Sequence, residues 1–357
     1  MSKNNNKIYY IILGILFIIL FSFYNFSEYK NFHLNKIELE NTKIEFNKKL
    51  KSFTLDDIKI IDDINFYYTP DKNLITKIIN HIENAEKEIF LEVYMLTETR
   101  IQEALIKAHK KGIIVKIILE KDPYLAYNIN NKAFEKLEKA GIDIIWSNKQ
   151  NYSYNHSKVL IIDNLSIIST GNYSYSTFTK NRDFFIFTTE KNINNKLREN
   201  FINDYNGIKI NIFDENLIFS PNSSRIKFEK LFDTANKDIK MYFQYFEDDE
   251  LVNRLINIKE EKNIEINVII PDTAKEDPNV KKMFDIGIKI NILSKHKMHA
   301  KSILIDNKYL FIGSINFSTY SIDKNREVGI LILNTEVINN FLEIFNQDVK
   351  TSFSNTK

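Results

Sequence analysis

The hydrophobic pattern between residues 85 and 165 changes period several times, and each change predicts a new element. Short apolar runs rich in Ile, Leu and Val are typical of strands, whereas apolar positions three and four apart are typical of a helix. The predicted elements alternate strand, helix, strand, helix, strand: 88–96, 99–112, 113–120, 131–141 and 142–146. Both predicted helices end on glycine, a helix stop signal. This alternation predicts an α/β sheet with helices on its faces.

The same order of elements returns in the second part of the chain. Four segments there echo four earlier ones in both pattern and order: 235–246, 265–272, 287–293 and 298–307 echo 85–96, 114–122, 141–146 and 155–164. A repeat of this length indicates duplication of a whole α/β unit rather than a short solenoid repeat. The pattern is interrupted near 205–218, so we expect the first unit over residues 61–207 and the second over 208–357.

The N-terminus carries a long apolar stretch. Residues from Ile8 to Phe21 are uncharged and almost wholly apolar, and this character continues, diluted, to Phe26. Lys3 and Lys7 precede it, so we expect residues 1–26 to form a single membrane anchor with a cytoplasmic N-terminus. Residues 27–60 would be a stalk leading to an extracytoplasmic body.

Two other interpretations of the apolar stretch are open. A cleaved signal peptide would make the protein secreted, but no small-x-small cleavage site follows the run. A buried core helix is disfavoured because no face of the stretch is polar. We therefore favour the uncleaved anchor.

Composition narrows the possible chemistry. The chain has 357 residues, 43% of them hydrophobic, and a net charge of +2, so composition gives no support to a nucleic-acid-binding surface. It contains no cysteine, which excludes disulfides, thiolate chemistry and zinc sites with cysteine ligands.

A polar motif recurs at the start of one apolar strand in each unit. The motif is H-x-K-x4-D, and its two copies consist of His156, Lys158 and Asp163, and of His299, Lys301 and Asp306. One copy alone would be an ordinary strand end with a partly exposed histidine and lysine. Because the chain has only 6 histidines and two occupy equivalent places in the repeat, the pair indicates a functional site.

Each motif is followed by a glycine-containing turn and then by an Asn-Arg-acid triplet. The turns lie at 169–176 and 312–319, and the triplets end on Asp183 and Glu327. The repeated spacing favours a role for these two acids in holding a motif histidine. The alternative is a strand-end ion pair with the neighbouring Arg182 or Arg326.

These residues resemble the phospholipase D superfamily, whose signature is two H-x-K-x4-D motifs, each followed by G-S-x-N. The second copy matches fully, with Gly313, Ser314 and Asn316, and the Ser314 hydroxyl and Asn316 are expected to add hydrogen bonds to the phosphate. In the first copy Gly171 comes one residue late, and either Asn172 or Ser174 would have to supply the polar contact to phosphate. The resemblance implies two tandem phospholipase D-like α/β/α sandwich repeats related by pseudo-two-fold symmetry.

The resemblance also implies roles for the site residues. The first motif's histidine is usually the nucleophile, the second the acid, and the acid of the triplet pairs with a motif histidine and fixes its tautomer.

The residues themselves suit phosphodiester cleavage, which needs a nucleophile, a proton for the leaving oxygen and positive charge around the phosphate. Histidine can do the first two, and one shared cleft would let Lys158 and Lys301 supply the third. No metal or cofactor is expected. Asp163 and Asp306 are expected to be structural turn residues. His296 would either add positive charge near the cleft or be a solvated loop residue.

From these observations we expect a metal-independent phospholipase D-type hydrolase that acts on membrane phospholipids through a phosphohistidine. Because both motifs lie in one chain, a monomer would suffice. The alternatives are an endonuclease with the same two histidines, with nucleic acid as the partner, a cardiolipin synthase-like phosphatidyl transferase, and a silent phosphate-binding domain. Members that make cardiolipin usually carry two membrane segments, and only one is predicted here.

Overall fold

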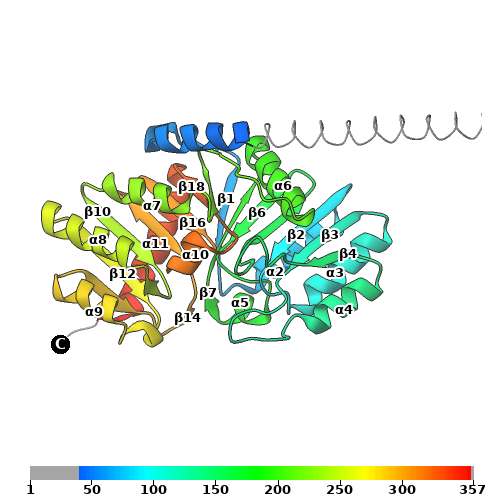
Figure 1. The fold of residues 1–357 in the computed structure, drawn as a ribbon. Helices are drawn as coiled ribbons and strands as arrows, with labels where there is room; N and C mark the ends of the chain where they lie inside the picture. The colour runs from blue at the N-terminus through cyan, green and yellow to red at the C-terminus, as the bar shows by residue number, and fades with distance from the viewer. Residues whose placement is uncertain (1–39, 355–357) are drawn as a thin grey trace, which may run out of the picture. The chain divides into compact units, whose positions relative to one another are not determined.

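A computed structural model describes residues 40–354 of the chain (Figure 1). The predicted anchor over residues 1–26 lies outside this range. Among the described residues, no helix has both the length and the apolar character needed to cross a membrane. The chain divides into two units, one ending at Ser52 and one beginning at Phe53. In the first unit, residues 40–52 are helical, and the second unit contains everything discussed below.

The first half of the large unit is built on a seven-stranded sheet with the order β1-β8-β6-β5-β2-β3-β4. Its strands are β1 (Ile64–Tyr68), β2 (Glu88–Val93), β3 (Ile114–Leu119), β4 (Asp143–Trp146), β5 (Lys158–Ile162), β6 (Leu165–Ser169) and β8 (Phe184–Thr188). Its helices are α2 (Lys72–Glu83), α3 (Thr99–Lys110), α4 (Asn131–Lys139), α5 (Tyr175–Thr179) and α6 (Lys191–Tyr205). The predicted elements between residues 88 and 146 are all present, each shortened by up to three residues.

The second half repeats this sheet and adds one strand at its edge, in the order β19-β13-β12-β10-β15-β16-β18-β9. Its strands are β9 (Leu217–Ser220), β10 (Asp238–Tyr242), β12 (Glu265–Ile270), β13 (Lys289–Ile292), β15 (Ser302–Ile305), β16 (Tyr309–Gly313), β18 (Glu327–Ile332) and β19 (Phe353–Ser354). Its helices are α7 (Ser224–Asp233), α8 (Asp249–Lys262), α9 (Pro278–Asp285), α10 (Thr319–Asp323) and α11 (Thr335–Thr351). Two 3-10 turns complete the large unit: η1 (Leu55–Asp57) and η2 (Asp272–Ala274).

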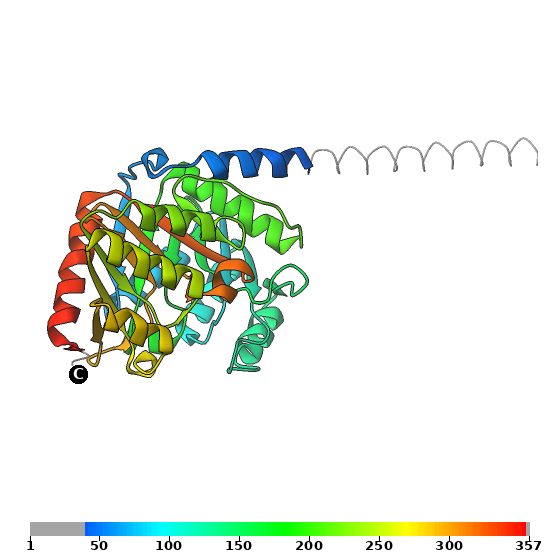
Figure 2. The same ribbon diagram turned by 60° about the vertical axis from the view of Figure 1, so that its left-hand side comes forward.

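The two sheets have the same strand order and the same directions. In each, one central strand pairs in parallel with the next strand along the chain and antiparallel with the motif strand: β2 with β3 and β5, and β10 with β12 and β15. The predicted duplication of a mixed α/β unit is therefore confirmed. Figure 1 shows the two sheets side by side, with α3 and α4 on one flank of the large unit and α8 and α9 on the other. Figure 2 gives a second view of the same arrangement. Helices α6 and α11 instead pack in the buried cluster that both sheets share.

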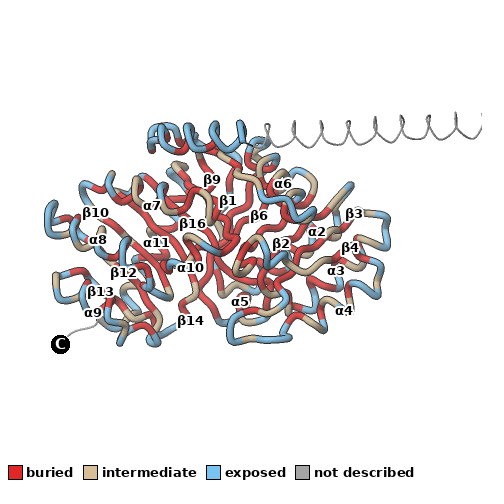
Figure 3. The backbone as a smooth tube through the Cα atoms, viewed as in Figure 1, coloured by how far each residue is buried: buried red, intermediate tan, exposed pale blue. Residues whose placement is uncertain are grey.

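Three clusters of buried side chains hold these layers together. One lies in the first half, between its sheet and helices such as α2 and α3, and one lies in the second half, under helices such as α7 and α8. The third is shared: Ile168 and Ile186 of the first sheet pack in one cluster with Leu310 and Ile330 of the second. Figure 3 shows buried backbone through the strands and exposed backbone mainly on the helices. The two halves therefore form one body with a common core.

Residues 53–58 were predicted to belong to the stalk. In the structure, Phe53, Leu55 and Ile58 are buried in the core cluster of the second half. This short segment is therefore part of the large unit.

Candidate active site

Each motif histidine is hydrogen bonded to an acid from the opposite half of the chain. Nδ1 of His156 lies 2.8 Å from Oε2 of Glu327, and Nδ1 of His299 lies 2.7 Å from Oδ1 of Asp183. Both acids are fully buried, and His156 is only 9% exposed. The structure therefore brings together the histidines and the triplet acids predicted from the sequence, and pairs them crosswise.

Short backbone pairings between the halves produce this crossing. β14 (Lys297–Met298), directly before His299, pairs in parallel with β7 (Asn181–Arg182), directly before Asp183. The peptide N–H of His299 then donates to the carbonyl of Arg182 at 3.2 Å. In the same way, Asn155 forms a parallel bridge with Arg326, and the N–H of His156 donates to the carbonyl of Arg326 at 2.8 Å. Each acid thus follows a segment docked beside the other half's motif.

The triplet arginines bind acids other than their neighbours. Arg182 donates from Nε and Nη2 to the carboxylate of Asp348 on α11, at 2.7 and 2.8 Å. Arg326 donates from Nη2 to Oδ1 of Asp204 on α6 at 2.7 Å, and to the hydroxyl of Tyr152. The sequence left open an ion pair between each arginine and the acid that follows it. In the structure, each arginine instead binds an acid on a distant helix. The arginines tie each triplet to the last helix of the opposite half.

Hydroxyl groups hold the two carboxylates in place. Ser321 donates to Oε1 of Glu327 at 2.6 Å, which leaves Oε2 for His156. Thr170 donates to Oδ1 of Asp183 at 2.7 Å. A carboxylate that is both buried and hydrogen bonded has a fixed orientation, and so it fixes the imidazole it contacts.

The surroundings keep both imidazoles neutral and both acids ionised. Burial lowers the pKa of His156 to about 4, although Glu327 opposes the shift. Burial likewise lowers the pKa of His299, against the opposing charge of Asp183. Burial acts to raise the pKa of Glu327, but the His156 contact and Lys158 bring it below its usual value. An ionised carboxylate only accepts, so Nδ1 carries the proton and Nε2 keeps a free lone pair.

The two motif lysines are buried among uncharged partners. Nζ of Lys158 donates to the carbonyl of His156 and lies 5.1 Å from the centroid of the Tyr94 ring. Nζ of Lys301 donates to Oε1 of Gln244 at 3.1 Å and to the carbonyl of His299. Burial lowers the pKa of Lys158 well below its usual value and that of Lys301 to about 8. The buried carboxylates whose charges act on these lysines, Asp183 and Glu327, are bound to the two histidines. Both buried ammonium groups can therefore take an added anion such as a phosphodiester.

Equivalent hydrogen bonds define how the two turns align. The N–H of Phe184 donates to the Thr170 hydroxyl at 2.9 Å, and the N–H of Val328 donates to the Ser314 hydroxyl at 3.0 Å. Thr170 is therefore the counterpart of Ser314, and Asn172 that of Asn316. This alignment differs from the one predicted from the sequence, in which Gly171 was matched with Gly313. Ser314 itself contacts the β18 backbone, and its hydrogen bond helps to lower the pKa of Glu327.

This register separates the two candidates for phosphate contact in the first half. Ser174 is the N-cap of α5 and accepts from the N–H of Thr177, as Ser318 does for α10. Asn172 and Asn316 instead have buried side-chain oxygens without a hydrogen-bond partner. Rotation of an amide by half a turn exchanges its oxygen for an NH2 donor. The amides of Asn172 and Asn316 therefore have hydrogen-bonding capacity left for a phosphate.

The motif glycines lie at close approaches between elements. A Cβ atom on Gly171 would lie 2.6 Å from Cγ2 of Thr177 and 2.8 Å from Cγ of Asp183. A Cβ atom on Gly313 would lie 2.4 Å from Cα of Gly329. Gly171 thus leaves room for the acid, whereas Gly313 leaves room for a neighbouring strand.

The motif aspartates cap backbone N–H groups at the other end of the motif strand. The carboxylate of Asp163 accepts from the N–H groups of Glu86, Lys87 and Glu88 at 2.8, 2.9 and 3.0 Å. Asp306 does the same for residues 236–238, at 2.8 to 3.2 Å. Their position is one of structural support.

Two residues beside the motifs were not found from the sequence. The ring of Tyr94 packs edge-on against the ring of His156, with centroids 4.5 Å apart. Its counterpart in the second half is Gln244, which follows β10 and accepts a hydrogen bond from Lys301. The aromatic residue and the amide occupy equivalent places after the central strands, and this difference makes the two halves of the site chemically unequal.

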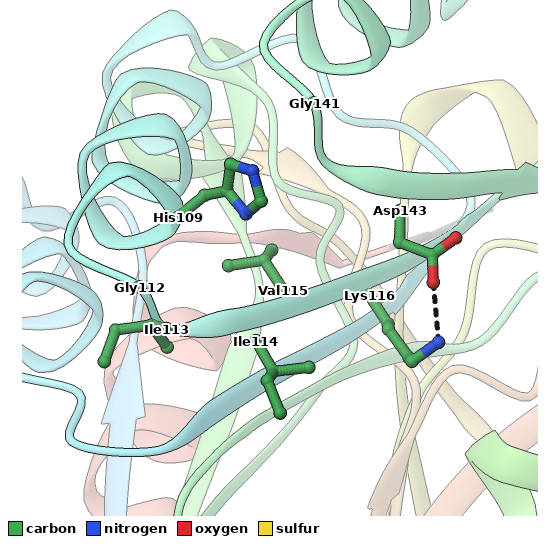
Figure 4. A pocket seen from close by; sticks show the side chains of 8 residues that line it. All are labelled: His109, Gly112, Ile113, Ile114, Val115, Lys116, Gly141 and Asp143. Carbon is green, nitrogen blue, oxygen red and sulfur yellow. Dashed lines mark hydrogen bonds and ion pairs between the residues drawn. The ribbon is translucent and has the colours of Figure 1, made fainter.

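Other candidate features lie away from these pairs. His296 is partly buried, and its pKa is lowered by burial and then by Arg182. A surface hollow of about 270 Å³ at the start of β3 and β4 is lined by His109, Lys116 and Asp143 among others (Figure 4). It lies at the opposite end of β3 from the motif residues, and its lysine is paired with its aspartate at 2.6 Å. Within residues 40–354, His, Asp and Glu form no group of three placed to hold a metal.

The fold and these contacts define a duplicated α/β protein with two crosswise His–carboxylate pairs. The family model for "Cardiolipin synthase, PLD-like domain" matches residues 78–205 and 228–349, which is more than half of the chain. The chain belongs to the phospholipase D superfamily.

Relatives and solved structures agree with this family. A cardiolipin synthase of Clostridium perfringens is 24% identical over 411 aligned positions, which cover 95% of this chain and 85% of that protein. A phospholipase D of Rickettsia felis is 24% identical over 57% of this chain and 98% of its own. The crystal structure of phosphatidylserine synthase from Haemophilus influenzae has the same fold, with a TM-score of 0.68, 12% identity, and coverage of 88% of this chain and 91% of that one.

Proposed function

We propose that the protein is a phosphatidyl transferase of the cardiolipin synthase type, which moves a phosphatidyl group from one phospholipid to an alcohol through a phosphohistidine. The observation that carries this proposal is the pair of crosswise His–carboxylate contacts around two buried lysines. Hydrolysis was the first expectation from the sequence. The likeness to cardiolipin synthases along most of the chain favours the transferase alternative instead.

In the first step, the free Nε2 of one histidine attacks phosphorus and a P–N bond forms. The bond from phosphorus to the head-group oxygen breaks, and that oxygen receives a proton from Lys301, which passes through Nε2 of the second histidine, His299. Lys158 and Lys301 balance the negative charge on the non-bridging oxygens, and the side-chain amides of Asn172 and Asn316 donate hydrogen bonds to these oxygens. No atom or electron is needed from outside the lipid, the two histidines and Lys301.

In the second step, an acceptor hydroxyl attacks phosphorus and the P–N bond breaks. Nε2 of His299 takes the proton of that hydroxyl and returns it to Lys301, which restores the starting state. Water as acceptor gives phosphatidic acid, whereas a phosphatidylglycerol hydroxyl gives cardiolipin.

The unequal surroundings support His156 as nucleophile and His299 as acid. The pKa of His156 is lowered to about 4, so its imidazole is unprotonated and nucleophilic at neutral pH. Nζ of Lys301 lies 3.4 Å from Nε2 of His299, and burial brings the pKa of Lys301 down to about 8. A proton can therefore pass between Lys301 and His299, which is what a general acid requires.

The test uses the full chain in vesicles that contain phosphatidylglycerol, without divalent metal. We expect cardiolipin and glycerol as the main products, and loss of both in His156→Ala and in His299→Ala. Phosphatidic acid as the sole product would instead support the hydrolase. Cleavage of plasmid DNA without lipid turnover would overturn the lipid proposal in favour of the endonuclease.

A further inference from the structure

The loop between β3 and α4 exposes four large apolar side chains within six residues. Their exposed fractions are 65% for Tyr124, 78% for Leu125, 67% for Tyr127 and 42% for Ile129. Single exposed apolar residues are ordinary, but a cluster of them marks an interaction surface. We refer to residues 121–130 as the β3–α4 loop.

The base of this loop is anchored. The Asn130 side chain donates to the carbonyls of Tyr94 and Glu120, at 2.8 and 2.7 Å, and accepts from the N–H of Leu96 at 3.1 Å. Leu125 has a φ of 55°, which non-glycine residues rarely adopt. The loop is therefore built on a fixed base, and its most exposed apolar side chain belongs to a residue in an unfavourable conformation.

The same loop contacts the site through one residue. The hydroxyl of Tyr94 accepts from the N–H of Tyr124 at 2.6 Å, and the Tyr94 ring packs against His156. The exposed cluster therefore lies at the edge of the site, one residue away from the proposed nucleophile.

The duplicated fold provides an internal comparison. In the second half, residues 271–277 join β12 to α9 at the equivalent place. Their exposed side chains are charged, with 71% exposure for Asp272, 44% for Lys275 and 73% for Glu276. The fold itself therefore does not require apolar side chains at this position.

We propose that the β3–α4 loop inserts its apolar tip into the interfacial region of a phospholipid bilayer and holds the site at the depth of the head groups. This inference rests on the proposed function. Tyrosine is enriched where membranes meet water, and two tyrosines here flank a leucine. Exposed Lys121 and Lys132 lie at the two ends of the loop and suit anionic head groups.

The absence of cysteine allows a direct test. Leu125→Cys, labelled with an environment-sensitive fluorophore, is prepared in the full chain and reconstituted in vesicles of phosphatidylcholine and phosphatidylglycerol. Lys275→Cys, labelled in the same way, is the matched control. We expect blue-shifted emission at position 125, quenched by lipids brominated near the head group, and solvent-like emission at position 275.

Equal, solvent-like emission at both positions would overturn the proposal. A blue shift at position 125 that appears without vesicles and grows with protein concentration would also overturn it, in favour of self-association. Label depth does not depend on turnover, so an inactive protein with a buried label would count against the proposed function and not against docking.

A second variant tests the consequence for activity. Leu125→Ser combined with Tyr127→Ser should lower the ratio of turnover on vesicles to turnover on a soluble short-chain phospholipid by about tenfold, roughly the effect of losing one buried apolar side chain. An unchanged ratio would overturn the proposed role. Lys275→Ser should leave the ratio unchanged.

Discussion

Nδ1 of His156 lies 2.8 Å from Oε2 of Glu327, a residue 171 positions further along the chain. In the second pair the order is reversed, because Asp183 precedes His299 by 116 positions. Each half therefore supplies a histidine and the acid that orients the other half's histidine. Neither half forms a complete His–carboxylate pair by itself, so both halves are needed for the site.

The first prediction concerns the carboxylate of Glu327. Glu327→Gln removes the negative charge and allows an NH2 group to face Nδ1, which favours the tautomer with the proton on Nε2. We expect turnover to fall by roughly 10²- to 10⁴-fold, as for orienting carboxylates in catalytic triads. Lipid turnover measures the loss, and nitrogen NMR of the histidines reports the tautomers.

The crosswise contact makes this prediction specific. The tautomer of His156 should change in Glu327→Gln, whereas that of His299 should change in Asp183→Asn. Exposed Glu260→Gln on α8 serves as the control and should alter neither. A change at His299 in the Glu327 variant would contradict the pairing.

The second prediction is an alkaline limb in the pH profile. Burial lowers the pKa of Lys301 from 10.5 to about 8, so the free enzyme loses this positive charge as the pH rises above 8. We expect kcat/KM to fall above about pH 8, with kcat less affected because a bound phosphodiester holds the proton on the lysine. Initial rates between pH 6 and 10 test this. A fall in kcat/KM centred near pH 10.5 would show that the pKa of Lys301 is not lowered.

The third prediction links pH to stability. The pKa of His156 is lowered from 6.5 to about 4, so between these values the unfolded chain binds a proton that the folded chain does not. The free energy of unfolding should therefore fall as the pH drops from about 6.5 toward 4, by up to ~1.4 kcal/mol per pH unit for one such group. The lowered pKa of Glu327 acts in the same direction at lower pH. Denaturant unfolding of wild type and His156→Gln measures the slope, which should be smaller in the variant.

The fourth prediction concerns the contact between halves. Asp348 accepts two hydrogen bonds from Arg182 and one from Tyr242, and it is only 2% exposed. Asp348→Asn leaves a buried guanidinium without its anion, which costs about 3–5 kcal/mol. Thermal unfolding should show the loss. As a control, Asp233→Asn removes an exposed pair with Arg254 and should cost about 1 kcal/mol or less. Equal effects would mean that Arg182 finds another partner.

Much of the fold could be predicted from the sequence because periodicity and repetition are local signals. Apolar runs predicted β2, β3 and β4, and the echo of H-x-K-x4-D predicted that two histidines would meet. The crosswise choice of acid could not be predicted. Each acid follows the histidine of its own half at nearly the same spacing, 183 − 156 = 27 and 327 − 299 = 28, and this spacing does not say which histidine the acid contacts. The choice depends on the pairing of β7 with β14.

The partners of the triplet arginines were missed for a related reason. Asp204 and Asp348 lie 144 positions apart, as do Arg182 and Arg326. This shared spacing was a signal, but it identifies equivalent residues and not contacts. The alignment of the first turn was also misjudged, because glycine was used as the marker. Hydrogen bonds of Thr170 and Ser314 reveal the true register.

The fifth prediction separates the two motif glycines. In Gly171→Ala the new methyl group would lie 2.8 Å from Cγ of Asp183, the acid that holds His299. The carboxylate must move, so we expect turnover to fall and the His299 tautomer to change. In Gly313→Ala the methyl group would meet backbone atoms, 2.4 Å from Cα of Gly329 and 2.7 Å from the carbonyl oxygen of Val328. Backbone in the middle of a sheet cannot yield easily, so the main loss should be in stability.

Measuring turnover and thermal unfolding on both variants distinguishes these effects. Gly171→Ala should lose more activity than its change in unfolding temperature explains, whereas Gly313→Ala should lose activity only as far as it unfolds. If Gly171→Ala keeps full turnover, then Asp183 does not need its present position to orient His299, and the second His–carboxylate pair is not required for the reaction. Because Glu327→Gln tests the first pair independently, the two results together decide whether both crosswise contacts are needed or only one.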